Sequence, residues 1–403
     1  MKAVVLAAGL GTRLNPLTAT RPKHLLPLGN STILERVLKV LGEVGVRDVC
    51  IVVHYLKDKI INTLGSGERF NVNITYVDQG AVKGTAHAIA AARDFVGGED
   101  FIAVYGDVTV NVDVLRRAIE LYREKSVSAV MVGVEVDDPW NYGVLSIDDE
   151  GYLIRVVEKP RRGEEPSNLI NAGIYVLDGS RVFRFIDETP VSPRGELEFT
   201  DTLQLLVNSG ERIAVLNGGR GWWFDVGRPW DLIGANRLAL SEVASNGVLI
   251  GGNVDFRGAI EVLPPVYIGS NSVIDGDCTI GPYTVICGNV RISRGTVIGN
   301  SVVMSGTIIG AHCQVMYSVL GENCIVENYV HFRFRSFDGG TVKMNIKGRR
   351  VDSGWFELGS VVGDGAFIGY GSIIGAGTSI YPKSIIPRLS LVLRDVKGVY
   401  CYS

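Results

Sequence analysis

The chain has 403 residues, 46% of them hydrophobic and 21% charged, and a formal net charge of −3. This apolar share is enough to build folded cores, so the composition excludes a wholly disordered protein. The near balance of 40 Lys and Arg against 43 Asp and Glu excludes a strongly basic surface, so we expect neither nucleic acid nor a membrane as a partner.

No apolar run approaches the 18 residues that a membrane-spanning helix needs. The apolar opening from Met1 to Ala8 runs into Gly9-Leu10-Gly11 without a cleavage-type ending. We interpret it as the first buried strand of a cytoplasmic protein. The six cysteines form no C-x-x-C pair and no zinc-like spacing, which favours reduced core residues.

Strand-like and helix-like segments alternate along the first half of the chain. Apolar β patterns cover residues 3–7, 49–54, 101–105 and 129–134, and helical patterns cover residues 33–41, 85–92 and 114–125. This alternation predicts an α/β domain with a Rossmann-like, mostly parallel sheet covered on both faces. Ligands of such sheets bind beyond the carboxyl ends of the strands, so we expect a site after Ala7 and after Tyr105.

The second half has a six-residue period. The first run of aliphatic residues on this period is Ile268, Ile274, Ile280, Ile286, Ile292 and Ile298, and the second is Val362, Ile368, Ile374, Ile380 and Ile386. A hexapeptide period predicts a parallel β-helix whose aliphatic residues stack inward. We therefore predict one domain over residues 1–240 and a β-helix domain over residues 246–403. A basic insertion at about residues 331–358 is either a binding loop or a solvated excursion.

The loop after the first predicted strand has features of a phosphate site. Glycines in Gly9-Leu10-Gly11 permit close backbone approach, so that amides can point at phosphate oxygens. Arg13 and Lys23 follow on the same loop and can neutralise a polyphosphate. The loop lacks the Gly-Lys-Ser/Thr ending of a Walker motif, and Leu14 replaces the third glycine of a dinucleotide fingerprint.

Leu6 to Leu14, followed by Arg21-Pro22-Lys23, closely resembles the signature of sugar-1-phosphate nucleotidylyltransferases. Further motifs follow in that family's order: Gln79 with Gly84-Thr85-Ala86, Tyr105-Gly106-Asp107, Tyr142-Gly143-Val144, Glu158-Lys159-Pro160, Asn171-Ala172-Gly173-Ile174-Tyr175 and Trp223-Phe224-Asp225-Val226-Gly227. With the hexapeptide repeats, the whole chain resembles archaeal-type bifunctional sugar-1-phosphate nucleotidylyltransferase/acetyltransferases. The resemblance implies a nucleotidyltransferase domain followed by a left-handed β-helix.

The resemblance also implies the reaction and the residues that perform it. A sugar 1-phosphate attacks the α-phosphorus of a nucleoside triphosphate; because this nucleophile is already an anion, alignment and charge neutralisation are required rather than a general base. The implied catalytic residues are Arg13, Lys23, Asp107 and Asp225, and the two aspartates would hold Mg²⁺. The implied nucleotide-binding residues are Leu6, Ala7, Ala8, Gly9, Gly11, Thr12, Gln79, Gly84 and Thr85. The implied sugar-phosphate residues are Tyr105, Gly143, Glu158, Lys159 and Asn171.

Gln79 offers an amide donor and acceptor to a pyrimidine, and Gly84-Thr85 would leave space for the base. This favours dTTP or UTP as the triphosphate, with glucose 1-phosphate or N-acetylglucosamine 1-phosphate as the acceptor. A GTP-using mannose-1-phosphate guanylyltransferase is the alternative, because Gln79 alone does not exclude guanine.

Two functions compete for the β-helix. As an acetyltransferase it would use acetyl-CoA, with His312 as the base that deprotonates an amino-sugar phosphate. The residue three after this histidine is Val315 where the family has Tyr, and the Asn expected to contact substrate is missing. Alternatively, the domain is structural: it assembles a homo-oligomer, a trimer by analogy with relatives, or binds a regulator.

Overall fold

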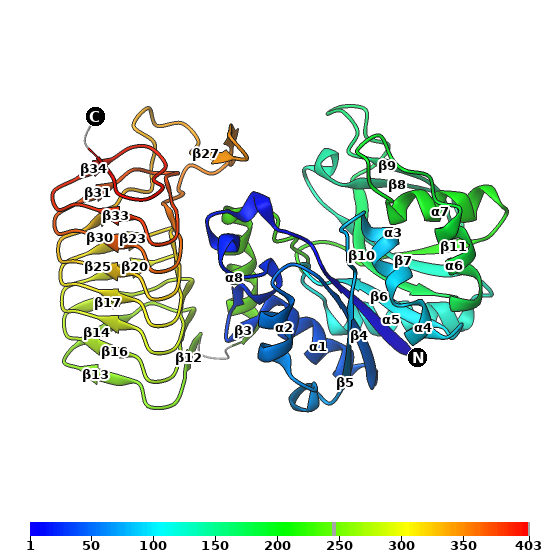
Figure 1. Cartoon of the computed structure of the whole chain (residues 1–403), viewed down its shortest axis with the longest axis horizontal. Helices are drawn as coiled ribbons and strands as arrows, with labels where there is room; N and C mark the ends of the chain where they lie inside the picture. Colours follow the sequence, from blue (N-terminus) through cyan, green and yellow to red (C-terminus); the bar gives the residue numbers. More distant parts are fainter. Residues whose placement is uncertain (244–246, 402–403) are drawn as a thin grey trace. The chain divides into compact units, whose positions relative to one another are not determined.

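In a computed structural model, residues 1–243 and 247–401 of the chain are described. The predicted boundary between residues 240 and 246 falls largely on residues 244–246, which lie outside the described residues, and the predicted domain limits stay a prediction. The chain divides into two compact units (Figure 1). Unit 1 contains Met1–Gly9 and Ile33–Asp225, and unit 2 contains Leu10–Thr32 and Val226–Ser403.

Unit 1 is built on a nine-stranded mixed sheet with the strand order β11-β7-β10-β6-β1-β4-β5, extended by β8 and β9. Along this order β10 pairs antiparallel with both β6 and β7, while the other pairs are parallel, which confirms a mostly parallel core sheet. The strands are β1 (Lys2–Ala7), β4 (Asp48–Val53), β5 (Asn73–Asp78), β6 (Phe101–Tyr105), β7 (Ala129–Glu135), β8 (Gly143–Ile147), β9 (Leu153–Glu158), β10 (Leu169–Leu177) and β11 (Ile213–Asn217).

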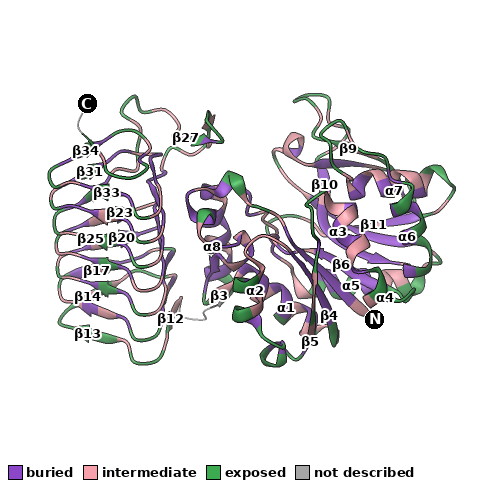
Figure 2. Cartoon of the chain, in the orientation of Figure 1, coloured by how far each residue is buried: buried purple, intermediate pink, exposed green. Residues whose placement is uncertain are grey.

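Helices cover this sheet, and its central strands are buried (Figure 2). In β1 and β6 the residues from Ala3 to Val5 and from Phe101 to Val104 are fully buried, as the apolar runs predict. The helices of unit 1 are α1 (Ile33–Glu43), α2 (Lys57–Leu64), α3 (Thr85–Ala91), α4 (Arg93–Val96), α5 (Val112–Glu124), α6 (Gly179–Asp187) and α7 (Phe199–Asn208), with short 3₁₀ turns η4 (Glu68–Phe70) and η5 (Pro139–Asn141).

Local sequence explains where the predicted helices begin and end. Asn111 caps α5: its side-chain oxygen accepts hydrogen bonds from the amides of Asp113 at 2.9 Å and Val114 at 3.1 Å. This cap starts the helix two residues earlier than the apolar pattern predicts. The pattern over residues 85–92 corresponds to α3, which ends at Ala91; Ala92 leaves the helical conformation, and α4 begins at Arg93, after the predicted segment. None of the described helices combines the length and the hydropathy required to span a lipid bilayer.

Unit 2 contains the predicted left-handed β-helix, with three parallel sheets of seven strands each. The first comprises β12 (Val248–Ile250), β15 (Val266–Ile268), β18 (Thr284–Ile286), β21 (Val302–Val303), β24 (Val319–Leu320), β29 (Val361–Val362) and β32 (Ser379–Ile380). The second comprises β13 (Asp255–Arg257), β16 (Val273–Asp275), β19 (Arg291–Ile292), β22 (Ile308–Ile309), β25 (Ile325–Val326), β30 (Phe367–Ile368) and β33 (Ile385–Ile386). The third comprises β14 (Ile260–Val262), β17 (Cys278–Ile280), β20 (Val297–Gly299), β23 (Gln314–Met316), β26 (His331–Phe332), β31 (Ile373–Ile374) and β34 (Leu391–Val392).

The strand register explains the six-residue period. Ile268 pairs with Ile286, 18 residues later, so one coil consists of three hexapeptides, one for each sheet. The isoleucines on the period point inward and are almost fully buried, as predicted. Ile286 pairs with Val303, only 17 residues later, and this shorter coil shifts the phase of the period. Leu320 pairs with Val362, because an insertion with the antiparallel hairpin β27 (Lys343–Ile346) and β28 (Arg349–Asp352) lies between them.

Unit 2 also contains the residues from Leu10 to Thr32 and the helix α8 (Pro229–Val243). The first segment forms the 3₁₀ turns η1 (Thr12–Leu14), η2 (Leu17–Ala19) and η3 (Lys23–Leu25) and the strands β2 (Pro27–Leu28) and β3 (Ser31–Thr32). Buried Asn236 joins the segment to α8: its side chain accepts from the amide of Gly29 at 2.8 Å and donates to the carbonyl of Pro27 at 2.9 Å.

Candidate active site

Two loops begin at the same edge of the unit 1 sheet. Leu6 on β1 pairs with Tyr105 on β6, and the amide of Gly106 donates to the carbonyl of Leu6 at 2.9 Å. The glycine-rich loop therefore starts beside the loop that carries Asp107. This is the carboxyl edge of parallel strands, where the sequence predicts a ligand.

A short antiparallel contact joins the segments that carry the two predicted metal ligands. Val108 forms a β-bridge with Asp225, and Thr109 exchanges hydrogen bonds with Phe224 at 3.0 and 2.8 Å. This pairing brings Asp107 next to the bridge in which Asp225 takes part. The two aspartates are 118 positions apart in the sequence, and the fold places their backbones side by side.

A pair of carboxylates suits Mg²⁺, which keeps several waters or phosphate oxygens as ligands. Among the described residues, no group of three or more His, Cys, Asp or Glu side chains is arranged to hold a metal ion. The joint binding of a metal ion by Asp107 and Asp225 therefore stays a prediction.

Tyr105, Asn171 and Tyr175 form a hydrogen-bonded polar cluster at an irregularity of β10. The register of β10 against β7 shifts between Asn171 and Tyr175, and Asn171 exchanges hydrogen bonds with the Tyr175 hydroxyl at 2.6 and 2.9 Å. The two tyrosine hydroxyls lie 3.4 Å apart. Burial raises the pKa of Tyr105 to about 12, so its hydroxyl stays protonated as a hydrogen-bond donor at neutral pH.

Gly173 makes the irregularity possible. Its φ is +73°, and a Cβ at this position would lie 2.6 Å from Cδ2 of Tyr105. Only glycine meets both the conformation and the close approach. The glycine of the Asn171-Ala172-Gly173 motif is therefore required for packing against Tyr105, in addition to the predicted contact of Asn171 with the sugar.

Glu158 and Lys159 lie at the end of β9, opposite Gly143 on β8. Lys159 Nζ is 3.7 Å from Glu158 Oε1. The structure adds Arg194, whose Nη2 lies 3.2 Å from Glu158 Oε1 and 2.9 Å from Glu198 Oε1. Sequence reasoning missed Arg194, since a single arginine between Pro193 and Gly195 carries no spacing signal.

The predicted base-binding residues also lie together in unit 1. Gln79 is 6% exposed, and its amide nitrogen donates to the carbonyl of Gly84 at 3.1 Å and lies 3.1 Å from Nδ1 of His87. Gly84 has φ +110°, and a Cβ there would lie 2.4 Å from the carbonyl oxygen of Leu197. The protein backbone therefore requires this glycine; its role beside a base stays a prediction.

The cationic part of the predicted site belongs to unit 2. Gly11 has φ +63°, and its carbonyl accepts a hydrogen bond from Thr18 Oγ1 at 2.8 Å. Arg13 is exposed, and Lys23 begins η3. Asp107 and Asp225 belong to unit 1, so the joint action of these cations and carboxylates on one triphosphate stays a prediction.

His312 is part of an aromatic stack at one corner of the β-helix. Its φ is +55°, its ring stacks on Tyr329 with 5.2 Å between centroids, and Tyr329 meets Tyr370 edge-on at 5.6 Å. A Cβ at Gly295 would lie 2.4 Å from His312 Nδ1. These contacts give His312 a packing role; its predicted role as a base is untested.

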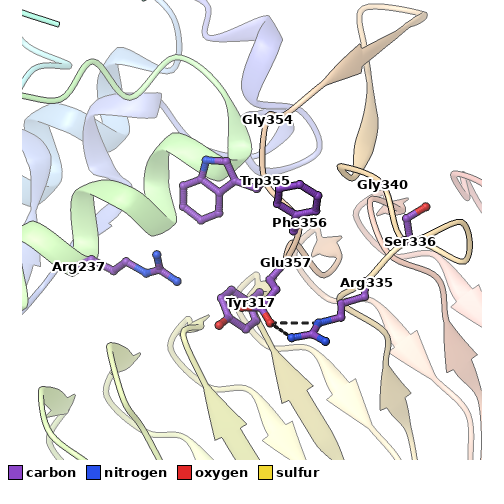
Figure 3. A pocket seen from close by; sticks show the side chains of 10 residues that line it. Arg237, Tyr317, Arg335, Ser336, Gly340, Gly354, Trp355, Phe356 and Glu357 are labelled. Atoms are coloured by element: carbon purple, nitrogen blue, oxygen red, sulfur yellow. Dashed lines mark hydrogen bonds and ion pairs between the residues drawn. The ribbon is translucent and has the colours of Figure 1, made fainter. Parts of the chain in front are cut away.

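The insertion borders an open pocket of about 440 Å³ on unit 2. Figure 3 shows Arg237 and Arg335 on opposite sides of this pocket, with Tyr317 and Glu357 between them and the rings of Trp355 and Phe356 above them in the view. Arg335 is paired with Glu357. The pocket therefore combines aromatic faces with a guanidinium from α8, whose Cζ lies 5.1 Å from the centroid of the Trp355 ring.

Comparison with known proteins identifies the family. The family model described as "Nucleotidyl transferase" matches residues 2–242, and that described as "GMPPB C-terminal domain" matches residues 262–348. A bifunctional sugar-1-phosphate nucleotidylyltransferase/acetyltransferase of Sulfurisphaera tokodaii is 32% identical over 384 residues, which cover 90% of each chain. The chain belongs to the sugar-1-phosphate nucleotidylyltransferases. The predicted family, fold class and enzyme class are thereby confirmed.

Two further matches extend the comparison. The bifunctional protein GlmU of Methanococcus vannielii is 34% identical over 415 residues, which cover 98% of this chain and 96% of the relative. The structure of a Bacillus anthracis protein described as a glucose-1-phosphate thymidylyltransferase superposes with a TM-score of 0.54 and 33% identity, covering 59% of this chain and 95% of that one. Nucleotidyltransferases of this family act on a nucleoside triphosphate and a sugar 1-phosphate and generally use a divalent metal ion.

Proposed function

We propose that this nucleotidyltransferase transfers a pyrimidine nucleotide from dTTP or UTP to glucose 1-phosphate or N-acetylglucosamine 1-phosphate. The observation that carries the proposal is the β-bridge between Val108 and Asp225, which joins the segments bearing the two candidate metal ligands at the carboxyl edge of the sheet. Gln79, on which the choice of a pyrimidine rests, is buried, and its contacts with Gly84 and His87 hold its amide in a fixed orientation.

In the proposed reaction an oxygen of the sugar phosphate forms a bond to the α-phosphorus, and the bond from that phosphorus to the pyrophosphate oxygen breaks. Nothing needs to remove a proton from the nucleophile, which is anionic at neutral pH. Residues of the chain therefore have two tasks: to align the nucleophile with the leaving group and to stabilise the charge on the phosphates.

Arg13 and Lys23 would neutralise the triphosphate and the departing pyrophosphate, while the backbone of residues 9–12 approaches the phosphates closely. Asp107 and Asp225 would hold Mg²⁺, which would offset the negative charge of the phosphates. Lys159 would hold the sugar phosphate, and Glu158 and Asn171 would accept hydrogen bonds from sugar hydroxyls.

The sugar side of this proposal draws on the polar cluster of β10. Asn171 is held by Tyr175 and by the amide of Gly173, which donates to its side-chain oxygen at 3.0 Å. A polar group held in a fixed orientation favours sugars whose hydroxyl lies where that group can meet it.

Pyrophosphate release tests the proposal. The full chain with Mg²⁺ is offered dTTP, UTP and GTP, each with glucose 1-phosphate, N-acetylglucosamine 1-phosphate and mannose 1-phosphate. We expect turnover with a pyrimidine triphosphate and with glucose 1-phosphate or its N-acetylamino derivative. Turnover confined to GTP with mannose 1-phosphate would instead establish the guanylyltransferase alternative.

A second function, acetyl transfer by the β-helix, is favoured by one observation: the relatives from M. vannielii and S. tokodaii match the chain almost throughout and are both named as bifunctional. His312 would serve as the base in that reaction, and acetyl-CoA would be the donor. Thiol release from acetyl-CoA with glucosamine or galactosamine 1-phosphate tests this function. If neither acceptor releases thiol, the β-helix has the assembling role instead.

A further inference from the structure

Arg21 belongs to the Arg21-Pro22-Lys23 part of the family signature, and we call the segment from Leu10 to Lys23 the signature loop. Two carboxylates of the β-helix hold the Arg21 side chain. Its Nη1 donates to Glu322 Oε1 at 2.7 Å, and its Nη2 donates to Asp364 Oδ2 at 2.6 Å. Thr20 Oγ1 donates to the same Asp364 oxygen at 2.6 Å. The Arg21 side chain is only 8% exposed, so its guanidinium is enclosed, while the side chains of Asp364 and Glu322 are 17% and 42% exposed.

The coils of the β-helix place Glu322 and Asp364 next to each other. Leu320 pairs with Val362, so Glu322 and Asp364 occupy matching positions after β24 and β29 on successive coils. Asp364 Oδ1 accepts the amide of Glu322 at 2.8 Å, and the amide of Gly365 donates to the carbonyl of Glu322 at 2.7 Å. Two like charges at neighbouring positions repel each other, and a guanidinium between them relieves that repulsion.

Arg21 is two residues from Lys23, and the connection between them is stiff. Pro22 fixes the backbone at φ −63°, and η3 starts at Lys23, whose carbonyl accepts the amide of Leu26 at 3.0 Å. The stem of Lys23 in turn packs on the glycine loop: a Cβ at Gly11 would lie 3.2 Å from Lys23 Cβ. Contacts therefore run without interruption from the β-helix corner to the glycine loop.

We propose that Arg21 is a positioning residue for nucleotidyl transfer, which fixes Lys23 and the glycine loop by anchoring them to Glu322 and Asp364 of the β-helix. The inference rests on the proposed function, in which Lys23 and this loop bind the triphosphate. It gives the β-helix a part in the first reaction, separate from any acetyl transfer. Loss of the anchor leaves the sugar side intact, so the KM for the triphosphate should change and the KM for the sugar phosphate should not.

The test uses the full chain and the variants Arg21→Met, Arg21→Lys and Asp364→Asn. We expect Arg21→Met to raise the KM for UTP or dTTP by about tenfold or more, with the KM for the sugar 1-phosphate within about twofold of wild type. Arg21→Lys should restore only part of the loss, because a single ammonium cannot hold two carboxylates in the planar geometry of a guanidinium. The double variant Arg21→Met/Asp364→Asn should be no worse than Arg21→Met alone, since both changes break one interaction.

Arg388→Met is the matched control. Arg388 makes a two-point pair with one carboxylate, that of Glu327, at another corner of the β-helix, at 2.8 and 2.9 Å, and its side chain is exposed. We expect this variant to keep both wild-type KM values. If Arg21→Met does not fold, Arg21→Lys and Glu322→Gln make the same comparison.

Calorimetric titration with UTP and dTTP separates this inference from the proposed function. The positioning role is overturned if the wild type catalyses nucleotidyl transfer and the Arg21 variants bind and use the triphosphate as well as the wild type does. If Arg21→Met raised the KM for the triphosphate and the KM for the sugar phosphate equally, and Arg388→Met did the same, the positioning role would also be overturned. Arg21 would then have a structural role only. A wild type that binds the triphosphate but releases no pyrophosphate contradicts the proposed function, whereas weaker binding by Arg21→Met would still support the anchor.

Discussion

At the scale of single residues, Asp107 permits a test of the predicted metal role. It follows β6 in a loop whose backbone is held by the bridge at Val108. Asp107→Asn keeps the shape of the side chain and removes its charge, so the candidate metal ligand is lost while the loop is retained. We expect turnover to fall by about a hundredfold or more, with the melting temperature close to that of wild type. Pyrophosphate release and thermal unfolding measure the two effects.

Asp149→Asn is the control for this prediction, because Asp149 is an exposed aspartate of the β8–β9 turn. We expect it to keep wild-type turnover. Near-normal turnover of Asp107→Asn would remove this residue from the metal role and leave Asp225 to be tested alone.

Gly173 permits a second prediction at this scale. Alanine at this position must adopt φ +73° and would bring its Cβ to 2.6 Å from Tyr105 Cδ2. Gly151→Ala is the matched control, because it has φ +82° but no atom within 4 Å of the added Cβ. We expect Gly151→Ala to lower the free energy of unfolding by about 1 kcal/mol and Gly173→Ala by about 2–4 kcal/mol, as measured by urea denaturation. Equal losses would mean that Tyr105 moves aside without cost.

At the scale of secondary-structure elements, the inward isoleucines carry the stability of the β-helix. Ile298 on β20 is fully buried, and Ile308 on β22, two strands later, is 43% exposed. Ile298→Ala leaves a cavity between coils, for which we expect a loss of about 2–5 kcal/mol, whereas Ile308→Ala should cost less than about 1 kcal/mol. Urea denaturation followed by circular dichroism measures both. Similar losses for the two variants would contradict the assignment of inward and outward faces.

The sequence predicts these elements well where a local period dictates them. Six-residue spacing is enough to identify the coils, because each inward residue stacks on an equivalent one coil away. It does not predict the shift of register on β10 between Asn171 and Tyr175, since that irregularity depends on Tyr105 of another strand. Nor does it predict the 17-residue coils. Each of these coils has one residue fewer at a corner, and in the sequence this appears only as a shift in the phase of the hexapeptide pattern.

At the scale of the whole molecule, the limits of sequence reasoning lie in contacts between distant segments. The motifs identify the glycine loop and the aspartates, because the family keeps them in a fixed order. The partners of Arg21 are 301 and 343 residues away, on corners that carry no motif of their own. Such pairings depend on three-dimensional register and not on local pattern, so the anchor appears only in the structure.

The assembly predicted for the β-helix is also a property of the whole molecule. One outer face carries an apolar row in register across β22, β25, β30 and β33, in which Ile308, Ile325 and Ile385 are 43–45% exposed and Phe367 lies between them. A continuous apolar row on a flat sheet is suited to association with further copies of the chain. If the chain forms the expected trimer, light scattering should give three times its 43.6 kDa mass.

Ile325→Glu places a charge in the middle of this row, so we expect its mass to fall to that of a single chain, because burying an unpaired carboxylate opposes association. Ile154→Glu is the control: Ile154 is 50% exposed on β9 of unit 1 and is not part of the row, so this variant should keep the wild-type mass. A wild type that elutes as a single chain would contradict the trimer itself. An Ile325→Glu variant that stays trimeric would instead place the contact on another side of the β-helix, since its charge would then remain in water.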